Sequence, residues 1–72
     1  MDKNLFASFM KRHGDTQQIL AEEMGISLSR LNAKINETGG AQFGSNEIQF
    51  IAKRYRMKAK DIVACFFAQK VS

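Results

Sequence analysis

The sequence contains few of the residue types on which metal and redox sites depend. Among its 72 residues there is one cysteine, one histidine, and no proline or tryptophan. The single cysteine, Cys65, excludes an intramolecular disulfide, and its apolar neighbours predict a buried thiol that acts as a small hydrophobic side chain. His13 has no second ligand nearby for zinc, and we expect it on the surface. We therefore expect no metal and no cofactor.

Patterns typical of enzymes are also missing. The glycine-rich segment GGAQFG (39–44) lacks the Lys-Ser/Thr ending and the preceding strand of a phosphate-binding loop. Glu22 and Glu23 are adjacent, so on a helix they point about 100° apart and do not form an acid–base pair. We expect that the protein is not an enzyme.

No long hydrophobic run is present either. No apolar stretch approaches the roughly 20 residues of a membrane-spanning helix, and the N-terminus lacks the pattern of a signal peptide. We therefore expect no membrane contact and a cytoplasmic location. The chain is short enough for one domain over residues 1–72, and so small a core would gain from pairing with a second copy.

Positive charge is concentrated in the second part of the chain. The net charge is +4. Residues 1–25 have three Lys or Arg against four Asp or Glu, whereas residues 26–72 have eight against three. A basic region suits a polyanionic partner, although an ordinary solvated basic face explains the charge equally well.

Apolar spacing and glycine positions predict an all-α fold of five helices. We expect helices over residues 4–13, 16–24 and 28–36, a fourth that is capped by Ser45 and includes residues 48–55, and a fifth over about 59–67. Asp15 or Thr16 caps the second helix, and Asp15-x-x-Gln18 has the spacing of a capping box. Phe43, in the loop of residues 37–44, is expected to pack against the core. The fourth and fifth helices are expected to join through one irregular turn.

The most informative part of the chain is the segment TQQILAEEMGISLSRLNAKIN (16–36), which is predicted to form two short helices. In its first helix the apolar positions at helical spacing are Ile19, Leu20, Ala21 and Met24, and the outward face is expected to hold Gln17, Gln18, Glu22 and Glu23. Gly25 supplies a left-handed residue that ends this helix, and Ser27 caps the next one. Leu31 and Ile35, four residues apart, form the inner face of the second helix. Two short helices joined by a tight turn are typical of a helix-turn-helix.

This segment resembles the DNA-binding motif of the Cro and lambda-repressor family. The matching residues, in order and spacing, are Gln17, Ala21, Gly25, Ile26 and Leu31. Lys34 stands where that family commonly has an apolar residue. The ending NEIQFIAKRYRMKAKDIVACFFAQKVS is similar to that of small phage-encoded Cro-like proteins, which share the Lys-then-apolar order. The resemblance implies a compact five-helix, lambda-repressor-like fold.

The second helix of the motif is the expected recognition helix. With Leu31 and Ile35 inward, helical rotation turns Ser29, Asn32, Ala33 and Asn36 outward. Short polar groups, an amide and an apolar contact suit base edges in the major groove. Together with the resemblance, this gives the expected base-reading residues: Ser27, Leu28, Ser29, Arg30, Asn32, Ala33 and Asn36. An ordinary polar surface helix is the alternative.

Phosphate contacts are expected from groups that flank this helix. The candidates are Gln17, Lys34, Gly39, Gly40, Ser45 and Asn46. For Lys34, a solvated lysine is an equally simple explanation. The cations of residues 53–60 are expected to lie too far from the groove to contribute.

The expected function is that of a Cro-like transcriptional repressor in a phage or prophage, which acts by occupying double-stranded operator DNA. It would work in the cytoplasm of a bacterial host, associated with the nucleoid. A homodimer is expected through an apolar patch of Val63, Phe67 and Val71, unless Phe67 packs against the first helix of a monomer. Two alternatives remain: an anti-repressor that binds a protein through the Phe-rich last helix, and an architectural DNA binder in recombination.

Overall fold

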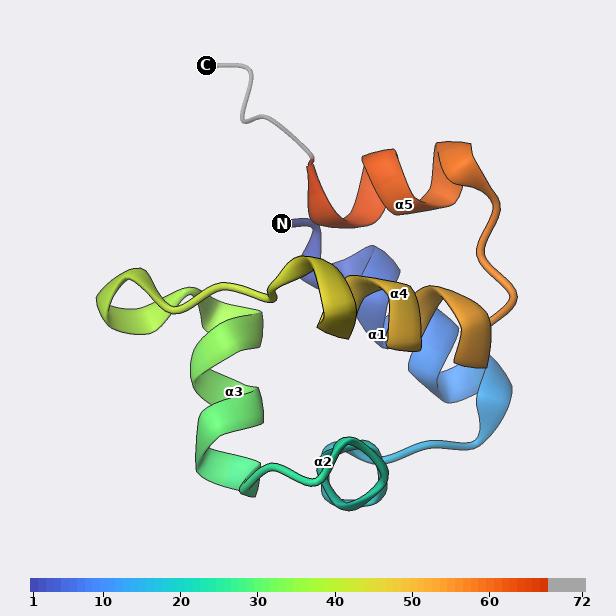
Figure 1. Ribbon diagram of the computed structural model, residues 1–72. Helices are drawn as coiled ribbons and strands as arrows, with labels where there is room; N and C mark the ends of the chain where they lie inside the picture. The colour runs from blue at the N-terminus through green and yellow to red at the C-terminus, as the bar shows by residue number, and fades with distance from the viewer. Residues whose placement is uncertain (68–72) are drawn as a thin grey trace.

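The computed structural model describes residues 1–67 of the chain. Over these residues it contains five α-helices and a short 3-10 turn (Figure 1). They are α1 (Lys3–His13), α2 (Gln17–Met24), α3 (Leu28–Asn36), η1 (Thr38–Gly40), α4 (Ser45–Arg54) and α5 (Ala59–Phe66). The described residues contain no strand, which confirms the all-α class.

Each of the five helices contributes one fully buried side chain to a common core. These side chains are Phe6, Leu20, Leu31, Ile51 and Cys65. Burying a large apolar side chain stabilises a fold by roughly 1.5–3 kcal/mol. The core therefore holds all five short helices together, since none is long enough to be stable alone in water.

An aromatic cluster of Phe6, Phe43, Tyr55 and Phe66 joins the core to the side chains packed against it. The ring of Phe6 lies 5.8 Å from Phe43, 6.4 Å from Tyr55 and 6.0 Å from Phe66, measured between centroids. Phe43 belongs to the loop before α4, so the expectation that it packs against the core is confirmed. The ring contacts connect this loop to α1, α4 and α5.

The helices are arranged so that α3 lies at one side of the molecule. In Figure 1, α2 is seen end-on while α3 runs in the plane of the picture, so the two axes cross steeply. The connection from α4 to α5 lies on the opposite side. The N-terminus is held to α5 because the Asp2 N–H donates to the Cys65 carbonyl oxygen at 2.8 Å.

Of the two candidate caps of α2 the structure confirms Thr16, whereas the capping box of Asp15 and the cap at Ser45 are wrong. The hydroxyl of Thr16 caps α2 by accepting the Ile19 N–H at 3.2 Å, so Asp15 forms no capping box. Asp15 has stronger partners elsewhere, described below. The N-cap of α4 is Gly44, whose N–H donates to Glu47 Oε1 at 2.8 Å, and Ser45 is the first helical residue.

One apolar assignment is also wrong. Ile19 was expected on the inner face of α2, but it is 40% exposed. Its neighbours Leu20 and Ala21 are buried. An eight-residue helix has room for only a narrow buried stripe, and Ile19 lies at its edge.

The connection between α4 and α5 is an irregular turn, as expected. Arg56 has a left-handed backbone (φ 53°), and the Met57 N–H donates to the Ala52 carbonyl oxygen at 2.8 Å. The carboxylate of Asp61 then accepts the Lys58 N–H at 3.0 Å and begins α5. Within residues 1–67, no helix has the length and apolar content needed to cross a membrane.

Candidate nucleic-acid interface

The turn between α2 and α3 fixes how these helices cross. Gly25 is left-handed (φ 72°), and its N–H donates to the Glu22 carbonyl oxygen at 3.1 Å. The Ile26 N–H donates to the Ala21 carbonyl oxygen at 3.0 Å, which completes a Schellman motif. Ala21 is buried where the helices meet. The predicted role of Gly25 is confirmed.

Helix α3 has the predicted bounds and the predicted register. Ser27 Oγ accepts the Arg30 N–H at 3.1 Å and caps the helix. Leu31 is fully buried and Ile35 is 6% exposed, so both face the core. This register confirms that Ile35, and not Lys34, is the inner apolar residue.

The opposite side of α3 is largely open to solvent. Leu28, three residues before Leu31, flanks the inner face and is 44% exposed, whereas Ala33 on the outward side is half-buried. The other exposed candidates are Ser27, Ser29, Arg30, Asn32 and Asn36. Six of the seven expected base-reading residues therefore lie on α3 and the seventh, Ser27, is its N-cap; all except Ala33 are exposed.

A chain of polar contacts runs along this exposed side and joins three helices. Asn32 Nδ2 donates to Gln17 Oε1 of α2 at 3.3 Å. Asn36 Nδ2 donates to Asn32 Oδ1 at 3.2 Å and to the Asn32 carbonyl oxygen at 3.0 Å. Lys3 Nζ of α1 lies 3.4 Å from Asn36 Oδ1. Sequence reasoning missed Lys3, because nothing in the sequence places the start of α1 beside the end of α3.

Most candidate phosphate ligands lie at helix ends or in turns. Gln17 is the first residue of α2, and Ser45 and Asn46 are exposed in the first turn of α4. Gly39 (φ 61°) and Gly40 (φ 82°) are exposed in η1, just beyond the end of α3. In Figure 1 this turn follows the C-terminal end of α3 on the same side of the molecule.

Lys34 is the exception among the phosphate candidates. Its ammonium lies 2.8 Å from Glu47 Oε1 and donates to the Gln42 carbonyl oxygen at 3.3 Å. Burial raises the pKa of Glu47, but hydrogen bonds from Lys34 and the Gly44 N–H outweigh it, so the pKa is lowered overall. Lys34 thus joins α3 to the start of α4, a role that sequence reasoning did not foresee.

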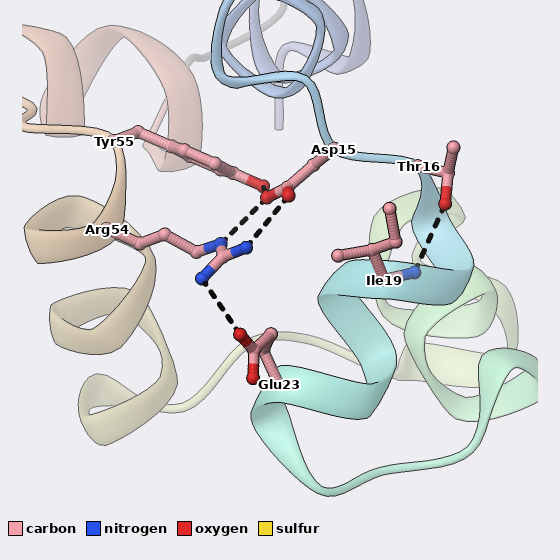
Figure 2. Close-up of polar contacts among 6 residues, drawn as sticks. All are labelled: Asp15, Thr16, Ile19, Glu23, Arg54 and Tyr55. Atoms are coloured by element: carbon pink, nitrogen blue, oxygen red, sulfur yellow. Dashed lines mark hydrogen bonds and ion pairs between the residues drawn. The ribbon is translucent and has the colours of Figure 1, made fainter.

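A second polar cluster, formed by Asp15, Glu23, Arg54 and Tyr55, holds the start of α2 against α4 (Figure 2). Asp15 accepts hydrogen bonds from Arg54 Nε at 2.7 Å, Arg54 Nη2 at 2.8 Å and the Tyr55 hydroxyl at 2.7 Å. Arg54 Nη1 also lies 3.5 Å from Glu23 Oε1. The hydrogen bonds from Arg54 lower the pKa of Asp15 despite its burial. Burial and the contact with Asp15 raise the pKa of Tyr55.

The expected dimer patch can be placed only in part. Val63 is 58% exposed and Phe67 is 59% exposed, so both face outward as the helical spacing predicts. Val71 lies outside the described residues. Cys65, which lies between these two residues in the sequence, is fully buried. Burial raises the pKa of its thiol to about 11.

Among residues 1–67, no three His, Cys, Asp or Glu side chains gather as metal ligands would. Comparison of the chain with protein-family models, with curated proteins and with solved structures found no match.

Proposed function

We propose that this protein binds double-stranded DNA sequence-specifically, with α2 and α3 acting as a helix-turn-helix and α3 entering the major groove. The observation that carries the proposal is the exposed polar face of α3, on which Asn32 is held by Gln17 and Asn36. In Figure 1, α3 crosses α2 steeply and lies at the edge of the molecule. A lambda-repressor-like fold is part of the proposal.

The contacts of Asn32 leave it suited to an adenine. Its amide nitrogen donates one hydrogen to Gln17, and its oxygen accepts one hydrogen bond from Asn36. An asparagine side chain has two donors and two acceptor sites, so one of each remains. Adenine offers N7 as acceptor and its N6 amino group as donor in the major groove, which matches that remaining pair. Because its neighbours already orient Asn32, little side-chain freedom is lost on binding.

Other residues on α3 complete the proposed reading face. Ser29 and Arg30 are exposed donors, and an arginine in this position can bind guanine through two hydrogen bonds. Leu28, 44% exposed, presents an apolar surface of the kind that contacts a thymine methyl group. Ala33 and Asn36 also lie on the outward side, and Ser27 precedes it as the N-cap of α3.

Phosphate groups are proposed to bind on both sides of α3. Gln17 keeps its own amide hydrogens for a phosphate oxygen, since only its oxygen is used by Asn32. The backbone of Gly39 and Gly40, together with Ser45 and Asn46, would bind the strand beyond the other end. Lys34 has three donors, of which two are used, so one remains for a phosphate without loss of its pair with Glu47.

A repressor of the Cro type is the biological role we propose, acting in a bacterial cytoplasm by occupying an operator. A second copy paired through Val63 and Phe67 would present two α3 helices to half-sites about 34–36 Å apart. Repression by occupancy requires only affinity and concentration, so no sensor domain is needed.

The test begins with selection of binding sites from a pool of random-sequence duplexes by the wild-type protein. On the selected duplex, Asn32→Ala should weaken binding by about 1–3 kcal/mol and relax the preference at one base pair. Asn4→Ala, the same change at an exposed position on α1, is the matched control and should bind like wild type. Failure to enrich any sequence, or equal binding by a folded Asn32→Ala protein, would refute the proposed reading face.

A further inference from the structure

Most of the exposed positive charge lies away from α3. Five exposed cations are here called the far cationic surface. They come from the end of α1, the end of α4, and residues 56–60, which include the connection from α4 and the start of α5. They are Arg12, Lys53, Arg56, Lys58 and Lys60. In Figure 1 the connection from α4 to α5 lies on the side opposite α3.

Two shallow hollows connect three of these cations, Arg12, Lys53 and Arg56, across helices. Arg12, His13 and Arg56 line one hollow together. His13 and Lys53 line the next one. His13 therefore connects the cations of α1 with those of α4, and its ring also packs against Tyr55 at 5.4 Å between centroids.

Little negative charge offsets these cations. Asp15 lies near them but is bound to Arg54, whose charge we therefore leave out of the surface. Asp61 lines the first hollow, and its carboxylate accepts the Lys58 N–H. Asp61 is the one carboxylate that lines either hollow, so the neighbouring cations repel one another, and a polyanion would relieve that repulsion. On the α3 side, among residues 1–67, the exposed cations are Lys3, Arg30 and Lys11, which lines a hollow together with Gln17.

We infer that the far cationic surface binds the phosphate backbone of a second DNA duplex, so that a molecule bound through α3 bridges two duplexes. The bridging rests on the proposed function of α3. A straight duplex in contact with α3 leaves the far cationic surface free, because the two surfaces face away from each other. DNA is the favoured polyanion because binding at α3 already places other duplex segments at high local concentration.

The experiment measures energy transfer between a donor-labelled and an acceptor-labelled duplex, both of the selected sequence, together with binding of each duplex singly. Two variants lose the same charge: Lys53→Gln/Lys60→Gln on the far surface, and Lys3→Gln/Arg30→Gln on the α3 side. All four residues are exposed, and thermal melting checks that both variants fold. Wild type should give transfer that falls steeply between about 50 and 200 mM salt.

The far-surface variant should bind a single selected duplex within about twofold of wild type, since specific binding depends on base contacts at α3. The energy transfer measured with this variant should fall to about one fifth of the wild-type value or less. The slope of the logarithm of transfer against the logarithm of salt concentration should become shallower by about two. The α3-side variant should instead lose affinity for the single duplex.

Three results would overturn the inference. The first is absence of transfer with wild type on a duplex that it binds. The second is transfer that survives in the far-surface variant, which would assign bridging to a dimer. The third is loss of binding to phosphatidylserine vesicles in that variant with no change in transfer, which would assign the surface to membranes. If only the far-surface variant loses single-duplex binding, the role proposed for α3 fails while the far surface remains a DNA-binding site.

Discussion

Replacing Asp15 with Asn tests whether the Asp15–Arg54 contact holds the start of α2 in place. The Asp15 side chain is 3% exposed and accepts three hydrogen bonds, two of them from Arg54. Asparagine has nearly the same shape but no charge, and its amide group cannot accept both Arg54 donors. The change therefore removes the ion pair with little effect on packing.

The expected loss can be estimated from these contacts. Hydrogen bonds to charged groups contribute roughly 1.5–3 kcal/mol each, and breaking a buried ion pair costs about 3–5 kcal/mol. Arg54 remains 19% exposed and regains some hydration, so we expect a decrease near the lower limit, about 3 kcal/mol, in the free energy of unfolding. A chain of this length has about 4–11 kcal/mol of stability in total. The melting temperature should decrease by about 12–24 °C.

Thermal and urea unfolding, followed by circular dichroism, would measure the change. Glu23→Gln is the matched control, because Glu23 faces the same arginine at 3.5 Å but is 55% exposed. It should lose no more than about 1 kcal/mol. Equal stability losses in the two variants, or no loss in Asp15→Asn, would refute the reasoning.

The same contact predicts a pH dependence. Because the pKa of Asp15 is lower in the folded protein than its ordinary value of 3.8, the ion pair stabilises the fold fully above that value. This contribution is lost as the pH falls below 3.8 toward the folded-state pKa. Asp15→Asn should therefore lose less stability than wild type over that range.

Three further predictions concern other parts of the molecule. Gly25→Val should lower the free energy of unfolding by at least about 1–2 kcal/mol through backbone strain alone, since a Cβ there meets nothing within 4 Å; an unchanged melting temperature would contradict this. Cys65 should resist iodoacetamide at pH about 8 in the native protein and react in denaturant, because burial raises its pKa to about 11; rapid labelling of the native protein would show that α5 opens. Phe67→Ser should shift sedimentation of a wild-type dimer toward the monomer, and identical association of the two proteins would exclude Phe67 from the interface.

Local sequence signals predicted the α2–α3 unit almost completely. The cap at Ser27, the left-handed Gly25 and the inward pair Leu31 and Ile35 all depend on residues within a few positions of one another. The aromatic residue Phe43 was also placed correctly, because a large apolar side chain in a short polar loop has few alternatives to the core.

Long-range polar contacts could not be predicted in the same way. Asp15 satisfies the local pattern of a cap, but its carboxylate gains more from Arg54, which is 39 residues later in the chain. Likewise Lys34 pairs with Glu47 and Lys3 contacts Asn36 only because the helices fold together. These partners depend on the packing of the whole domain, which spacing along one helix does not encode.

The most direct test of the central proposal is a titration of ¹⁵N-labelled protein with one equivalent of the selected duplex, followed through backbone amide shifts. We predict that the largest shifts cluster in α3, from Ser27 to Asn36, and at Gln17, and that they are absent for a scrambled duplex at the same salt concentration. Shifts confined to α5 around Val63 and Phe67, or equal shifts with the two duplexes, would contradict sequence reading by α3.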